Sequence, residues 1–212
     1  MADISITKSK LKTHFHYGWW KYLLALVISV FGISIVFDMT EYRPPEEKKT
    51  ELYILNGYAE AETLEGVLWP LLKEACPEQE LLTSMNINLL SEDIYVRMQY
   101  STYLAAHQGD VMLMPLSEFH NLLLDEGAET IFVELSPYIE SGVIQVDGID
   151  LSTGMAKATD GTEGLYGIPA DSLKGLEAYS CNPEGALLVS MSYGGNLDTA
   201  AKLIGIMMET LK

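Results

Sequence analysis

The chain has 212 residues, of which 48% are hydrophobic, and its 30 aspartate and glutamate residues outnumber 13 lysine and arginine residues. The formal net charge of −17 at pH 7 repels nucleic acid and anionic lipid headgroups, so we expect neither as a ligand. We expect the acidic residues to form a solvated, solubilising surface.

An uncharged apolar stretch, Tyr22–Phe37, lies near the N-terminus. Trp19, Trp20 and Lys21 precede it, and such aromatic and snorkelling side chains are typical of a membrane interface. Crossing a hydrocarbon core of about 30 Å takes roughly 20 helical residues, so the stretch reaches across when these flanking residues lie at the interface. The pattern predicts one membrane-spanning helix.

Charge on the two sides of this stretch predicts its orientation. Four lysines and one aspartate precede Tyr22, whereas residues 38–212 contain nine basic and twenty-nine acidic side chains. Under the positive-inside rule the basic arm stays in the cytoplasm and the acidic part is translocated. We therefore predict a cytoplasmic arm at 1–17, a transmembrane helix in the lipid bilayer at 18–39, and a single-pass cell-membrane protein with an extracytoplasmic C-terminal domain.

Two other N-terminal signals share a basic start and an apolar middle. A cleaved secretory signal needs a small-x-small motif after the apolar part, but the nearest one, Gly32-Ile33-Ser34, lies inside it. A bacterial lipoprotein anchor needs a cysteine soon after the span, and the first cysteine is Cys76. The sequence favours a retained anchor, with a cleaved signal as the alternative.

The residues after the span divide into a linker and a domain. Thr40–Thr50 is polar, has mixed charge and contains two adjacent prolines, which predicts an extended linker over 40–50. The remaining residues, 51–212, suit one extracytoplasmic domain with a single core.

Cysteines, histidines and catalytic motifs carry little chemistry in this sequence. Cys76 and Cys181 are either paired outside the cytoplasm or buried as two thiols, and the sequence leaves both open. His107 and His120 stand alone, so no zinc-ligand spacing occurs. A nucleophile elbow, a P-loop, a dinucleotide-binding glycine motif and a zinc-protease motif are all absent from the sequence. We expect no metal, no cofactor and no enzymatic activity.

Strand and helix patterns alternate along residues 51–141. Leu64, Leu68 and Leu72 recur at helical spacing, whereas the apolar run before Pro115 lacks polar alternation, as in a strand buried on both faces. This alternation predicts an α/β domain with a mainly parallel sheet. The predicted strands are 52–56, 85–90, 109–115, 131–135 and 186–191, and the alternation resumes at 165–169 after an interruption. Helices are predicted over 64–75 and 92–107, from Ser117 and Ser136, and from Asn196. The Gly-rich residues 142–164 predict an irregular or hairpin connection.

In their order, five segments of the chain resemble the extracytoplasmic solute-binding proteins of bacterial ABC importers, type 2 fold. They are ELYILNGYAEAETLEGVLWPLL (51–72), AAHQGDVMLMPLSEF (105–119), FVELSPYI (132–139), LYGIPAD (165–171) and ALLVSMSYGGNLDTAAKLIGIMMETL (186–211). The resemblance implies a periplasmic-binding-protein-like, three-layer α/β domain without catalytic activity, associated with a membrane transporter or another membrane protein.

The chain departs from this family in one region. Between the equivalents of SPYI and YGIP the family builds a second lobe, but here twenty-six residues separate Tyr138 from Leu165. That length is too short for a lobe with its own core. We therefore expect a single-lobe, membrane-anchored relative, which departs from the family's two-jawed closure around a solute.

The candidate ligand-binding residues follow from the position of the predicted strand ends. In open α/β sheets ligands bind beyond the carboxyl ends of the strands, and loops at such positions line the solute cleft in the resembled family. The alternative is a purely structural role, in which Tyr58 and Tyr166 cover the end of the sheet and Ser117 caps a helix. The candidates are Asn56, Tyr58, Glu60, Ser117, Tyr166, Asp171 and Ser172.

The sequence supports two functions. In the first, the domain is an accessory module that packs against a transporter or another membrane protein, because one lobe encloses a ligand on one side only. In the second, it is a receptor that binds a small solute or a peptide for an ABC importer, as the resemblance implies. We favour the accessory or partner-binding role.

Overall fold

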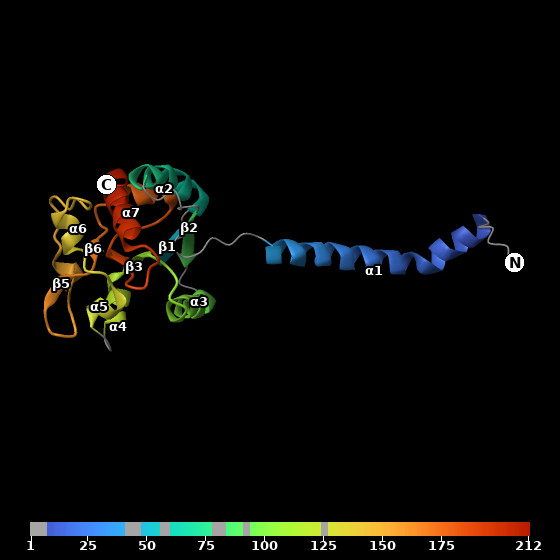
Figure 1. Cartoon of the computed structure of the whole chain (residues 1–212), viewed down its shortest axis with the longest axis horizontal. Helices are drawn as coiled ribbons and strands as arrows, with labels where there is room; N and C mark the ends of the chain where they lie inside the picture. Colours follow the sequence, from blue (N-terminus) through green and yellow to red (C-terminus); the bar gives the residue numbers. More distant parts are fainter. Residues whose placement is uncertain (1–7, 41–47, 56–59, 78–83, 91–93, 124–126) are drawn as a thin grey trace. The chain divides into compact units, whose positions relative to one another are not determined.

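The computed structural model describes residues 8–40, 48–55, 60–77, 84–90, 94–123 and 127–212 (Figure 1). The chain divides into two compact units, 1–43 and 44–212. The predicted linker residues 41–47 lie outside the described residues.

The first unit contains one long helix, α1 (Lys8–Thr40). Its segment Gly18–Thr40 has 23 residues and a mean hydropathy of 2.3 in its most apolar window, with none of that window buried in the protein. At about 1.5 Å per residue a helix of this length reaches across a hydrocarbon core of about 30 Å. The chain thus has an N-terminal apolar helix with the length and composition of a membrane span or a signal sequence.

The second unit is built on a mainly parallel sheet. Among the described residues five strands form it, in the order β2-β1-β3-β7-β6. β1 is parallel to both β2 and β3, whereas β7 is antiparallel to β3 and to β6, so four strands share one direction. This confirms the predicted α/β fold class. The strand bounds are β1 Lys49–Leu55, β2 Ser84–Leu90, β3 Val111–Pro115, β6 Ile168–Pro169 and β7 Ala186–Ser190.

Helices cover both faces of the sheet (Figure 1). Helices α2 (Ala61–Ala75) and α7 (Leu197–Thr210) share one core cluster with the sheet, while α3 (Ile94–Ala105), α4 (Leu116–Leu122) and α5 (Ala128–Ile131) lie on the side of the second. Successive residues of β3 alternate between the clusters, since Val111 and Leu113 belong to the first and Met112 and Met114 to the second. All four are buried, as predicted for a strand covered on both faces.

Two local predictions were wrong. Residues 131–135 form no strand: α5 ends at Ile131, and Phe132 makes one isolated bridge to Met191. The reason is that β6 already pairs with the edge of β7 that faces away from β3. Residues 131–135 can therefore reach β7 only past its last residue, Ser190. Ser117 does not cap α4, which begins at Leu116 after Pro115 and has no side-chain cap bond. By contrast, the helix predicted from Asn196 is present as α7, and Asn196 caps it, because its Oδ1 accepts the N–H of Thr199 at 3.1 Å.

Residues 140–164 pack against the core of the domain. Ile144 is buried, and Val146, Ile149 and Leu151 are half-buried against the cluster that holds α2 and α7. Helix α6 (Ser136–Glu140) precedes this segment. The segment itself contains the 3-10 helix η2 (Ser152–Gly154) and a hairpin in which β4 (Met155–Lys157) pairs with β5 (Glu163–Leu165). These four apolar side chains therefore extend the core of the domain, whereas Val143 and Met155 are exposed.

Candidate functional site

The carboxyl ends of β1 and β3 form a topological switch point. The chain leaves β1 into α2, which covers one face of the sheet, and leaves β3 into α4, which covers the other. At such a point the two connections diverge and leave a crevice in which open α/β sheets bind ligands. The sheet topology therefore identifies this edge as the candidate binding edge.

The predicted residues after β1 are partly outside the described structure. Asn56 and Tyr58 lie among residues 56–59 and are not described. Glu60 is exposed immediately before α2; its backbone N–H donates to the carbonyl of Tyr179 at 3.2 Å, and its carboxylate accepts the Thr63 hydroxyl at 3.1 Å. Tyr179 ends the 3-10 helix η3 (Lys174–Tyr179), so Glu60 joins the start of α2 to the segment that follows β6.

The structure brings three predicted residues to neighbouring strand ends. The Oδ1 of Asp171 accepts the N–H of Gly185 at 2.9 Å, and the carbonyl of Gly185 accepts the N–H of Leu116 at 3.0 Å. Ser117 follows Leu116 and is exposed, and Ser172 follows Asp171. The turn before β7 thus holds the ends of β3 and β6 together.

Ser172 is half-buried, and its hydroxyl oxygen is buried without a hydrogen-bond partner in the described part of the chain. Buried hydroxyls normally have a partner, so this oxygen has unused hydrogen-bonding capacity at the candidate edge.

Tyr166 lies away from these residues. It precedes β6, whereas Asp171 and Ser172 follow that strand. Its side chain is 4% exposed and belongs to the core cluster that contains Phe119 and Phe132. Burial, and then the nearby carboxylate of Glu134, raise the pKa of its phenol. Tyr166 thus packs in the core at the other end of β6.

The charge at the candidate edge is negative. The described acidic side chains there include Glu60, Asp171, Glu177 and Glu184, of which Glu177 lies 3.9 Å from Lys174. This excess of carboxylates repels anions and favours a neutral or cationic group at the edge.

Comparison with known proteins gave partial similarities. No protein-family model matches the chain, and no curated protein matches it. Several solved structures are similar over part of the chain, and three of them follow. An extracellular solute-binding protein family 1 from Alicyclobacillus acidocaldarius subsp. acidocaldarius DSM 446 has 20% identity and a TM-score of 0.39, covering 61% of this chain and 29% of that one.

The other two are similarly distant. Maltose-bound MalE3 of T. maritima has 15% identity and a TM-score of 0.34, covering 63% of this chain and 33% of that one. A probable secreted solute-binding lipoprotein from Streptomyces coelicolor has 15% identity and a TM-score of 0.31, covering 57% of this chain and 29% of that one. The matched part of each solved structure is thus a third of its length or less.

One buried carboxylate with an organising role was missed by sequence reasoning. Asp110 is 6% exposed at the start of β3; its Oδ2 accepts the N–H of Glu51 and its Oδ1 the N–H of Gly195, both at 2.8 Å. It therefore fixes β1 and the turn after β7 at the amino edge of the sheet. The feature of the sequence that could have indicated this role is the position of Asp110, directly before the fully apolar strand β3.

Tyrosines gather near Asp110 on the face covered by α3. Tyr53 and Tyr103 pack edge to face with ring centroids 5.2 Å apart, and His107 stacks on Tyr193 at 4.9 Å. Burial is the main cause that raises the pKa of Tyr53 and Tyr193 above the ordinary phenol value. The phenols of Tyr53 and Tyr193 are therefore neutral at physiological pH.

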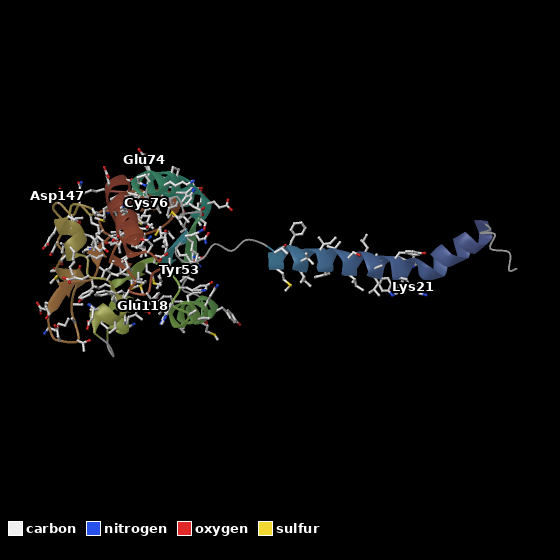
Figure 2. The ribbon with its side chains drawn as sticks, in the orientation of Figure 1. Lys21, Tyr53, Glu74, Cys76, Glu118 and Asp147 are labelled. Carbon is white, nitrogen blue, oxygen red and sulfur yellow. The ribbon has the colours of Figure 1, made fainter. Side chains whose placement is uncertain are left out.

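Both cysteines are free thiols. Cys76 follows the last residue of α2 (Figure 2), and Cys181 follows η3, with 3% and 2% of their surfaces exposed. Burial raises the pKa of Cys181 to about 11. Of the two alternatives that the sequence left open, the structure has the buried thiols.

Within the described residues, no group of three or more histidine, cysteine or acidic side chains is placed to hold a metal ion.

Proposed function

We propose that the chain is a non-catalytic, single-pass membrane protein that displays an extracytoplasmic, solute-binding-protein-like lobe as an accessory or partner-binding module. In this proposal residues 1–17 are the cytoplasmic arm, 18–39 the transmembrane helix, 40–50 the linker and 51–212 the displayed domain. The charge difference across the apolar stretch supports this orientation. The partner is a membrane transporter or another membrane protein.

The observation that carries this proposal is the placement of residues 140–164. These residues replace the segment that forms a second lobe in the resembled family, and four of their apolar side chains, Ile144, Val146, Ile149 and Leu151, pack on the domain's own core. A ligand at the switch point is then enclosed from one side, whereas small-molecule sites usually bury most of the ligand's surface. A protein partner brings its own opposing surface, so this edge suits a protein better than a small solute.

The alternative function is a receptor that binds a small solute or a peptide for an ABC importer. The unpartnered hydroxyl of Ser172 beside Asp171 favours it, because a ligand group supplies the missing hydrogen bond. The acidic edge restricts such a solute to neutral or cationic chemistry.

Site-specific photo-crosslinking in intact membranes tests the partner-binding role. A photo-reactive residue at Ser117 is expected to give a discrete protein adduct, because this exposed position lies at the candidate edge. The matched control is Ser152, an exposed serine in η2. Absence of an adduct at Ser117, or the same adducts from both positions, would count against the proposal. A rise in the melting temperature with sugars or amino acids would favour the solute alternative instead.

A further inference from the structure

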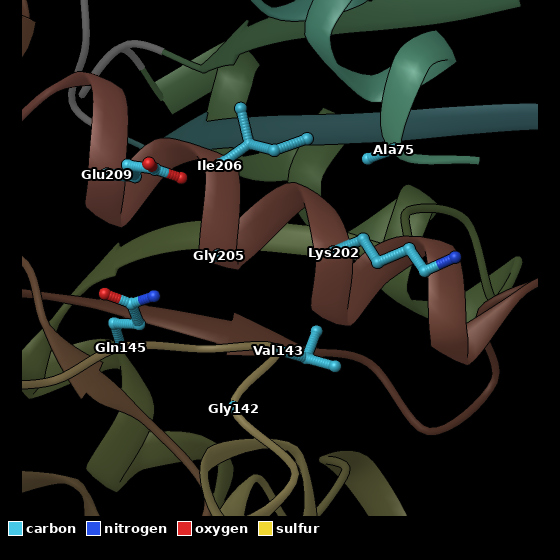
Figure 3. A pocket seen from close by; sticks show the side chains of 8 residues that line it. All are labelled: Ala75, Gly142, Val143, Gln145, Lys202, Gly205, Ile206 and Glu209. Atoms are coloured by element: carbon cyan, nitrogen blue, oxygen red, sulfur yellow. The ribbon is translucent and has the colours of Figure 1, made fainter. Parts of the chain in front are cut away.

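A hollow of about 260 Å³ lies on the outer side of α7, on a surface separate from the candidate edge. Figure 3 shows Lys202, Gly205, Ile206 and Glu209 along the helix, with the chain segment 142–145 running beside it. The spacing i, i+3, i+4, i+7 places these four residues on one stripe of the helix. The hollow is lined by Ala75, Gly142, Val143, Gln145, Lys202, Gly205, Ile206 and Glu209.

The wall of this hollow is held in place by backbone packing. A Cβ atom on Gly205 would lie 2.2 Å from the carbonyl oxygen of Val143, so the segment rests directly on the helix backbone. The next residue, Ile144, is 1% exposed, and its N–H donates to the carbonyl of Tyr138 at 3.1 Å. Val143 is 37% exposed between these fixed points. The hollow is therefore formed before any ligand arrives, which lowers the entropic cost of binding.

The hollow has opposite charges at its two ends and an apolar centre. Lys202 and Glu209 are seven residues apart on α7, a separation of about 10 Å along the axis at about 1.5 Å per residue. Within the described residues, no ion pair joins either side chain to a partner. Ile206, Val143 and Ala75 supply apolar surface between them. The matching ligand has an anionic end, a cationic end and an apolar middle.

We propose that this hollow binds a short peptide through its free termini. Three residues in an extended conformation span about 10 Å, which matches the separation of the two charges. The peptide carboxylate pairs with the ammonium group of Lys202, and its terminal ammonium pairs with the carboxylate of Glu209. A small apolar side chain of the peptide packs on Ile206 and Val143. Because Glu209 is exposed and Lys202 is only half-buried, solvent screens both pairs, so each contributes modestly and binding is weak.

Titration of the full-length protein in lipid nanodiscs with tri-alanine tests the site. We expect saturable binding at millimolar concentrations, with chemical-shift changes centred on the methyl groups of Val143 and Ile206. Amidating the peptide's C-terminus should weaken binding about threefold, and so should acetylating its N-terminus, as expected for loss of one exposed ion pair.

Charge variants assign each end of the peptide. Lys202→Gln should lower the affinity for free tri-alanine about threefold and leave the affinity for the C-terminally amidated peptide unchanged. Glu209→Gln should likewise lower the affinity for free tri-alanine about threefold and leave the affinity for the N-terminally acetylated peptide unchanged. The matched control is Lys174→Gln, an exposed lysine in η3. Absence of saturable binding, or an amidation effect that persists in Lys202→Gln, would overturn the proposal. The hollow is separate from Ser117. Failure of tri-alanine to bind would therefore not contradict the partner-binding role, and failure of crosslinking at Ser117 would not contradict peptide binding in the hollow.

Discussion

Replacing Asp110 by alanine is expected to lower the free energy of unfolding by about 3 to 5 kcal/mol. The carboxylate accepts two backbone N–H groups, from Glu51 and Gly195, each at 2.8 Å. Hydrogen bonds to a charged group contribute about 1.5 to 3 kcal/mol each, and the change leaves both donors without this acceptor in a largely buried place. Chemical denaturation monitored by circular dichroism, with full-length protein in detergent, measures the loss.

Two companion variants separate this effect from a general loss of charge. Asp110→Asn keeps the shape and one acceptor oxygen, so about half of the loss is expected. Asp147→Ala removes an exposed carboxylate and should leave the denaturation midpoint unchanged. A stability for Asp110→Ala close to that of the wild type would show that the carboxylate does not hold the two segments together.

Adding one methyl group to the helix glycines Gly205 and Gly66 is expected to have opposite effects. At Gly205 in α7 the new Cβ would meet the Val143 carbonyl oxygen at 2.2 Å, so segment 142–145 must move. Overpacking of this kind costs about 1 to 3 kcal/mol, and it exceeds the gain of up to about 1 kcal/mol from replacing glycine in a helix. We expect Gly205→Ala to lower the free energy of unfolding by about 1 to 2 kcal/mol.

Gly66→Ala is the matched control. Gly66 lies inside α2, and a Cβ there meets no atom within 4 Å. The helix preference of alanine should raise the free energy of unfolding by up to about 1 kcal/mol. Equal changes in the two variants would contradict the close contact between α7 and segment 142–145, and with it the preformed wall of the hollow.

Much of the fold could be predicted because regular burial leaves a periodic pattern. The helical spacing of Leu64, Leu68 and Leu72 corresponds to the buried stripe of α2, and the unbroken apolar run of β3 corresponds to burial on two faces. The strand predicted over 131–135 failed because pairing depends on which edge of the sheet is free. β6 already occupies that edge of β7, and which strand takes an edge depends on the arrangement of the whole sheet, not on the local sequence.

The candidate site was harder to predict because its geometry depends on contacts between distant segments. Asp171 and Leu116, the residue before Ser117, both bond to Gly185, which lies 14 residues after the aspartate, whereas Tyr166 packs in the core. The anchoring of Asp110 to Gly195 spans 85 residues. The hollow on α7 has no local signal either, since an isolated glycine in a helix does not reveal which backbone it faces.

The central proposal is an acidic lobe held outside the membrane by the N-terminal helix, and thiol labelling in intact cells tests it most directly. Because Cys76 and Cys181 are buried, the native protein gives little background with a membrane-impermeant maleimide. Cysteine at Ser141, an exposed position of the lobe, should react in intact cells, and cysteine at Thr13 should react only after permeabilisation. Labelling of Thr13→Cys with protection of Ser141→Cys would contradict the proposed orientation and the function that depends on it.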